Sequence, residues 1–305
     1  SYRATPWARF KRQICGPGSG NARLSQGDGH PDTVLAVKHG LFLAPTGELS
    51  NPRIFGQLAA EAESNGWDGL FVWDHVLRPP AEPAAIADPW ICLAVAAAAT
   101  SQIRVGPLVT PITRRRPIKL ARVTVSLDHL SQGRLTLGLG LGVDTSGELS
   151  KFGDIVDPKI RGERLDEGAE LLCALWSGSE VHFSGKHFVA DGALVLPKPV
   201  QHPRIPLWFA ARGAARKPVR RAARYDGLFP VDVTGDQLRA MLDLVGDARG
   251  SLDGFDVAAR PDDALSYDEL ADIGATWMLT DFSPGATLDE IEAAAGVSPK
   301  MAFHH

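Results

Sequence analysis

Long apolar runs and cysteines are what this 305-residue sequence has least of. No apolar stretch approaches the 18 or more residues of a membrane helix, so no membrane partner is predicted. The three cysteines, Cys15, Cys92 and Cys173, lack CxxC spacing, and no metal site is predicted. The net charge of −4 lacks the basic excess of nucleic-acid-binding proteins. With 44% hydrophobic and 22% charged residues, the sequence predicts a cytoplasmic globular protein with ample core.

Acidic residues are absent from the first 27 positions, which carry five Lys and Arg residues together with "GPGSG". A segment without a periodic apolar face cannot bury enough surface to order itself. We therefore predict a poorly ordered extension over residues 1–33, one domain over residues 34–299 and a short tail over residues 300–305.

From Val34 onward, apolar strands alternate with helical patterns. Asn51-Pro52 and Asp88-Pro89 offer N-cap residues followed by proline at the first helical position, and "TLDE" at 287–290 fits a capping box. Residues 181–206 form an excursion that could pair as a hairpin. The eight predicted strands lie within residues 34–45, 69–75, 103–112, 134–142, 207–211, 227–231, 255–259 and 275–282.

Eight apolar strands, each followed by a helix, predict an α/β fold of the (β/α)8 TIM-barrel type with an insertion between strands four and five. The competing architecture is a doubly wound sheet with a dinucleotide fingerprint. Its best candidate is "GLGLG" at 138–142, but Val143 and Thr145 stand where GxGxxG needs its last glycine. No GxSxG elbow of a hydrolase is present either.

Polar residues close the second strand, in "GLFVWDH". In a (β/α)8 barrel the active site lies at the carboxyl ends of the strands, so Asp74 and His75 would face the mouth of the barrel. An Asp-His pair that merely anchors the following loop is the alternative, and from this pair alone both interpretations stand.

Strand four places Gly138, Gly140 and Gly142 on one face and leucines on the other, with a period of two. If the leucines pack on helices, the glycines face inward and could clear a slot for a flat ring. A layer of small side chains opposite large neighbours would produce the same pattern.

Strand five ends in "AARGAARKP", a basic turn before a helix. Exposed amides and positive charge at such a turn favour an anion. A solvated basic loop is the alternative. Taken together, the strand ends outline a planar cofactor that carries phosphate.

The order and spacing of these motifs resemble those of the bacterial luciferase-like flavin-dependent oxidoreductases. The stretches that carry the resemblance include "GWDGLFVWDHV", "LSQGRLTLGLGLG" and "PRIPLWFAARG", and it covers residues 36–232 before thinning over the last seventy. Members of this family are α/β barrels that bind FMN or the deazaflavin F420 in the barrel mouth. Some are two-component monooxygenases or luciferases, and others transfer hydride with F420.

The resemblance implies a role for each matching residue. Asp74 and His75 would be the catalytic residues near the reactive face of the ring. Thr110 would border the ring, the strand-four glycines would lie beneath it, and the basic turn would hold phosphate. The residues implied in cofactor binding are Thr110, Gly140, Gly142, Arg212, Gly213, Arg216 and Lys217.

Two departures from the F420-type pattern shape the choice of cofactor. Strand three reads "VGPLVTP", one residue shorter than the pattern in which a bulge with a non-prolyl cis bond backs the ring. No glutamate stands at the end of strand four, although Asp144 is near. Both departures favour FMN over F420.

The sequence therefore predicts a monooxygenase that uses O₂ and reduced FMN, supplied by a separate flavin reductase, on a small organic substrate. His75 would donate a proton, and Asp74 would orient the imidazole or bind substrate. The first alternative is an F420H₂-dependent reductase or dehydrogenase, and the second is a non-catalytic flavin-binding accessory protein. Family analogy implies a homodimer.

Overall fold

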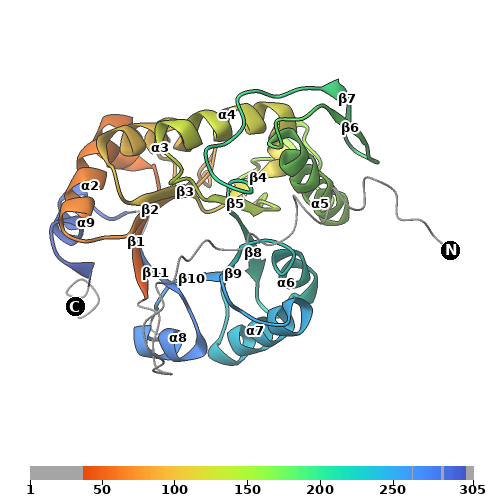
Figure 1. Cartoon of the computed structure of the whole chain (residues 1–305). Helices are drawn as coiled ribbons and strands as arrows, with labels where there is room; N and C mark the ends of the chain where they lie inside the picture. The colour runs from red at the N-terminus through yellow and green to blue at the C-terminus, as the bar shows by residue number, and fades with distance from the viewer. Residues whose placement is uncertain (1–36, 263, 283–284, 300–305) are drawn as a thin grey trace, which may run out of the picture.

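The computed structural model describes residues 37–262, 264–282 and 285–299. The predicted extension over residues 1–33 and the predicted tail over residues 300–305 lie outside these residues. Nine parallel strands form one sheet in the order β3-β2-β1-β11-β10-β9-β8-β5-β4, and the helices surround it (Figure 1). The strands are β1 (Lys38–Leu43), β2 (Gly69–Val72), β3 (Arg104–Pro107), β4 (Thr110–Pro111), β5 (Leu137–Gly140), β8 (Leu207–Arg212), β9 (Gly227–Val231), β10 (Asp256–Ala259) and β11 (Trp277–Asp281).

The sheet closes on itself through the third barrel strand, which is split into β3 and β4. β3 pairs with β2 and β4 pairs with β5, while a parallel bridge joins Val105 to Leu135. The split falls at Leu108–Val109, whose peptide bond is cis. The prediction that strand three departs from the bulged pattern is therefore wrong, because a two-residue interruption cannot be recognised by counting apolar letters. The predicted eight-stranded barrel is confirmed.

The helices begin where the sequence predicts. Asn51 caps α2, Asp88 caps α3, and each is followed by proline. Thr287 and Glu290 form the predicted capping box at the start of α9. The helices are α2 (Pro52–Ser64), α3 (Pro89–Ala99), α4 (Pro117–Leu130), α5 (Pro158–Leu175), α6 (Arg216–Ala222), α7 (Gly235–Arg249), α8 (Tyr267–Ile273) and α9 (Leu288–Ala295), with short 3-10 turns at Gly47–Ser50, Ile112–Arg114 and Ser150–Phe152. None of these helices combines the length and the apolar character that crossing a bilayer requires.

Two apolar clusters hold the barrel together. The larger lies between the strands and the surrounding helices. The smaller fills the barrel interior, where the rings of Trp208 and Trp277 lie 5.7 Å apart and are fully buried. Its members are Phe42, Phe71, Leu108, Trp208, Phe229, Ala258, Trp277 and Leu279.

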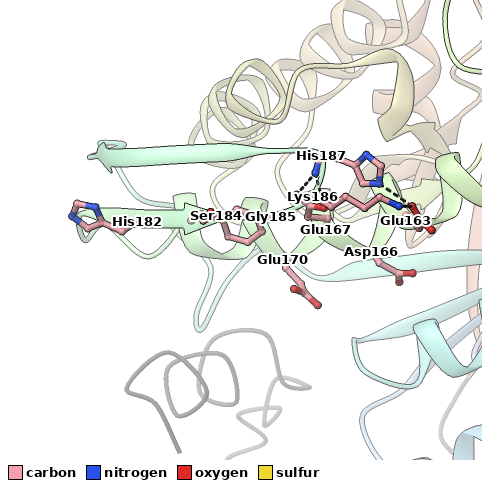
Figure 2. Close-up of a pocket in the computed structure, with 10 residues that line it drawn as sticks. Glu163, Asp166, Glu167, Glu170, His182, Ser184, Gly185, Lys186 and His187 are labelled. Atoms are coloured by element: carbon pink, nitrogen blue, oxygen red, sulfur yellow. Dashed lines mark hydrogen bonds and ion pairs between the residues drawn. The ribbon is translucent and has the colours of Figure 1, made fainter.

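The excursion between β5 and β8 contains the predicted hairpin, β6 (Val181–Ser184) and β7 (Val189–Ala193), which lies beside α5 at the edge of the molecule (Figure 1). Glu163 of α5 contacts Lys186 at 2.7 Å and His187 at 3.0 Å (Figure 2). Glu167 accepts hydrogen bonds from the backbone amides of His187 and Phe188. The hairpin thus partly covers the charged face of α5.

Candidate functional site

The residues that end β2 enter a network of buried ions at the barrel mouth. Asp74 is 2% exposed, and Thr110 donates a hydrogen bond to its Oδ2 at 2.8 Å. Arg114 and Arg115, in the turn after β4, contact Oδ1 at 3.1 and 2.9 Å. A buried carboxylate of this kind is tolerated because two cations and a hydroxyl replace its hydration. Asp74 is therefore a positioning residue that ties β2 to β4.

His75 lies beside this network and reaches the solvent. Its Nδ1 lies 3.0 Å from Oε2 of Glu148, and its side chain is 33% exposed. The prediction that Asp74 orients this imidazole is wrong, because Glu148 takes that place. Asp74 and His75 are neighbours in an extended segment, so their side chains point in different directions and only His75 faces the opening.

Glu148 comes from the loop after β5 and is held by several donors at once. Its Oε1 accepts the amides of Val76 at 2.5 Å and Leu77 at 3.1 Å, and Arg114 at 3.2 Å. Burial alone would raise the pKa of Glu148, but the hydrogen bonds from His75 and the two amides outweigh it and lower the pKa to about 2. Glu148 is thus an anion that can only accept, so Nδ1 of His75 carries the proton and Nε2 is left for a ligand.

Glu148 is the site residue that sequence reasoning missed. It lies eight residues beyond the last residue of β5, too far along for a strand-end argument. The connecting turn is fixed by Asp144, whose Oδ1 accepts the amides of Leu149 at 2.7 Å and Ser150 at 3.1 Å. In the sequence, the signal for Glu148 was that the loop after strand four contains acids, of which Asp144 was noted. The end of strand four carries no glutamate and so predicted no acid at the mouth, but Glu148 reaches the mouth from this loop.

The glycines of β5 do not open a slot. A Cβ on Gly138 would lie 2.3 Å from the carbonyl oxygen of Pro107, and one on Gly140 would lie 2.5 Å from the side chain of Val109. The interrupted third strand fills the space that was predicted for a ring. For Gly138 and Gly140 the pattern therefore reflects small residues that pack opposite larger neighbours. Gly142 has φ +74° and lies against Pro111.

An apolar floor lies across the mouth, on top of the interior cluster. It is formed by half-buried side chains at the strand ends, and the Trp73 ring contacts those of Phe42 and His75 at 6.0 and 5.6 Å between centroids. A flat aromatic ring fits such a surface, since it would bury apolar area beside the imidazole. The floor consists of Trp73, Val109, Ala210 and Val231.

The basic turn after β8 lies at the same end of the barrel. Arg212, Arg216 and Lys217 are exposed, and Arg212 pairs with Asp232 at 3.2 Å. Gly213 has φ +54°, and nothing lies within 4 Å of the place where a Cβ would be. The backbone there is open to a ligand, and the three cations would complement phosphate. The structure therefore brings His75, the floor and this turn to one mouth, while the hydroxyl of Thr110 is engaged with Asp74.

A separate cleft of about 630 Å³ lies between α5 and the hairpin (Figure 2). Its acids are already paired: Glu163 with the hairpin turn, and Asp166 with Arg221 at 2.7 Å and Arg224 at 2.7 Å. No group of three or more His, Cys, Asp or Glu residues in the described part of the chain could hold a metal ion. The barrel mouth is the better candidate for the site.

The fold is a closed (β/α)8 barrel with an apolar floor, an imidazole and a basic turn at its mouth, an end at which barrel enzymes carry their active sites. The family model described as luciferase-like monooxygenase matches residues 34–261. The chain belongs to this family, which confirms the resemblance seen in the sequence, and it is an oxidoreductase of the luciferase-like type.

The curated relatives include an uncharacterised protein and dehydrogenases that are named as F420-dependent. An uncharacterised protein of Mycobacterium tuberculosis (strain ATCC 25618 / H37Rv) is 32% identical over 257 residues, 77% of this chain and 89% of that protein. An F420-dependent glucose-6-phosphate dehydrogenase of Nakamurella multipartita is 30% identical over 68% of this chain and 62% of its own length.

Solved structures show the same fold. A coenzyme F420-dependent tetrahydromethanopterin reductase from Methanopyrus kandleri superposes with a TM-score of 0.71 at 18% identity, over 88% of this chain and 99% of that one. A monooxygenase from Streptomyces bottropensis gives 0.64 at 23% identity, over 88% and 80%.

Proposed function

We propose that this protein is an F420-dependent oxidoreductase that transfers hydride to or from a small carbonyl or alcohol substrate. The observation that carries the proposal is the His75–Glu148 pair at the mouth, which presents a single imidazole Nε2 above an apolar floor. The Nakamurella relative named as F420-dependent supports it. An acid does reach the mouth from the loop after strand four, since Glu148 lies beside His75.

The residues of the mouth fit a deazaflavin cofactor. The half-buried floor would carry the ring, and the exposed Arg212, Arg216 and Lys217 would hold its phosphate. When bound, the deazaflavin supplies a two-electron acceptor or donor of hydride.

The chain's own contribution is proton transfer and orientation. When an alcohol is oxidised, its carbon loses hydride and its hydroxyl proton passes to Nε2 of His75, so a carbonyl forms and the imidazole becomes cationic. Glu148 stabilises this imidazolium at Nδ1 through its negative charge. In the reverse direction, Nε2 returns the proton to the oxygen of the new alcohol. Asp74, Arg114 and Arg115 hold the strand ends in place.

The test is a fluorescence titration with F420, followed by turnover of alcohols and ketones under nitrogen. The wild type should bind F420, and His75→Gln should lower kcat by about 10² to 10⁴ while the Kd for F420 changes less than threefold. His182→Gln, on the exposed hairpin, is the matched control and should leave both unchanged. Binding of F420 with equal turnover in His75→Gln would refute the role of His75.

A monooxygenase that uses reduced FMN is the second candidate, because the matching family model bears that description. The same titration with reduced FMN, followed by admission of air, separates the two. Preferential binding of reduced FMN with oxygen consumption would replace the F420 proposal. A flavin reductase partner and a homodimer stay predictions.

A further inference from the structure

A second polar pair lies at the same end of the barrel as His75, on strands two and three places away from β2 around the sheet. Arg260 follows β10 and Asp281 ends β11, and the two form an ion pair through Nη1 and Oδ2. The guanidinium carbon lies 5.9 Å from the ring centres of both Phe42 and Phe229, which belong to the barrel interior. Arg260 therefore covers the interior cluster from above. Phe42 also contacts Trp73, so the floor separates this pair from His75.

The pair is neither fully buried nor freely solvated. The side chains of Arg260 and Asp281 are 27% and 26% exposed. Arg260 donates one N–H to Asp281, and a guanidinium carries five N–H donors. Asp281 offers a carboxylate acceptor beside those donors, and the backbone amide of Phe282 also hydrogen-bonds to it. Burial raises the pKa of Asp281 even though the neighbouring guanidinium opposes the shift.

A cavity of about 130 Å³ adjoins the pair, between the loops that follow β9 and β10. Its charged lining consists of Arg260 and three aspartates, Asp232, Asp262 and Asp281. Asp281 neutralises Arg260, and Asp232 and Asp262 add negative charge to the lining. Among the described residues that line this cavity, Arg260 is the cation and it is already paired with Asp281. The cavity therefore disfavours anions such as phosphate or carboxylate. A donor and an acceptor side by side complement a group that itself both donates and accepts.

We infer that Arg260 and Asp281 bind an uncharged hydroxyl group of the substrate, and that they select neutral over phosphorylated substrates. The inference deepens the proposed function, since it places this hydroxyl across the floor from His75. Two features set the substrate class. The aromatic floor accepts an apolar body, and the volume of the cavity limits the group at its far end to a few heavy atoms. Sugar phosphates are excluded by the aspartates.

The test uses cyclohexanol and cyclohexyl phosphate, which share one body and differ in a neutral hydroxyl and a phosphate. Binding of each to the full chain is followed by ligand-observed NMR without cofactor. The wild type should bind cyclohexanol at least tenfold more tightly. Arg260→Gln should weaken cyclohexanol binding about tenfold, because a charged hydrogen bond is lost. Arg53→Gln, on the exposed face of α2, is the matched control.

Asp281→Asn gives the opposite signature, which a merely structural role would not produce. Removing the carboxylate leaves the guanidinium uncompensated, so cyclohexyl phosphate should bind about tenfold more tightly than it binds the wild type. Preference of the wild type for cyclohexyl phosphate, or unchanged affinities in Arg260→Gln, would overturn the inference. These outcomes do not depend on F420, so failure of the cofactor titration would sink the proposed function separately.

Discussion

The two sides of the barrel mouth use ions in different ways. On the side of His75, Asp74 and Glu148 are 2% exposed, and their oxygens are shared among two arginines, a hydroxyl and backbone amides. On the side of Arg260, the ion pairs are simple and partly or largely exposed, as with Arg212 and Asp232 at 66% and 58%. The ions on the first side are buried like core residues, and they hold the imidazole of His75 in one position. The ions on the second side are solvent-accessible, so their hydrogen-bonding groups can contact a ligand.

The largest effect should come from breaking the buried network. Asp74→Ala leaves Arg114 and Arg115 without their shared carboxylate, and the free energy of unfolding should fall by about 3–5 kcal/mol. Asp232→Ala, which removes one partner of an exposed pair, should cost less than about 1 kcal/mol. Urea denaturation of both variants measures the difference. Equal losses would mean that the two sides are not distinct.

Acid should weaken the side of His75 through Glu148. The pKa of this group is about 2 in the folded protein against an ordinary value of 4.5. Its contribution to stability is therefore complete above pH 4.5 and is lost as the pH falls through about 2. The shift corresponds to roughly 3 kcal/mol. In urea melts at pH 6 and pH 3, Glu148→Gln should lose less stability than the wild type, and an identical loss would contradict the assignment.

Glycine substitutions sharpen the same contrast. Gly138→Ala forces a Cβ against the Pro107 carbonyl on the tightly packed side, and about 1–3 kcal/mol should be lost. Gly213→Ala meets no atom within 4 Å, but its φ of +54° still costs roughly 1 kcal/mol. In thermal unfolding, the Tm of Gly138→Ala should be lower than the Tm of Gly213→Ala. The reverse order would show that backbone conformation, not packing, limits these positions.

The smallest effect should come from the exposed basic turn. A double variant, Arg216→Gln with Lys217→Gln, should raise the Kd for F420 about tenfold at low salt, and by less at high salt because exposed charges are screened. Stability should stay within about 0.5 kcal/mol. A salt-independent loss of binding would argue against a phosphate contact.

Much of the fold could be predicted from the sequence, and the reasons are local. Asn51-Pro52, Asp88-Pro89 and the capping box at Thr287 mark helix starts whose hydrogen bonds form within a few residues. Apolar runs separated by such helices leave few arrangements other than a barrel. The split of strand three could not be predicted, because it depends on how Leu108 and Val109 pack against the glycines of β5.

The position of the candidate site could be predicted in part, for the same physical reason. His75 and the basic turn were predicted to lie together because strand ends converge at the mouth of a barrel. Glu148 was missed because a turn held by Asp144 carries it back over a distance that no spacing rule describes. Arg260 and Asp281 are 21 residues apart and become neighbours only when β10 and β11 pair.

The hairpin that lies on α5 has a consequence for sequence variation. Glu167 holds it by backbone amides, which every residue except proline provides, so this part of the attachment is specified by the helix and not by the hairpin. The exposed side chains of β6 and β7, such as His182, Ser184 and Val189, can therefore be exchanged, while Val181 and Phe183 keep the segment packed on the core. Such a strip is a natural point of divergence, where related proteins can acquire different surfaces without disturbing the barrel.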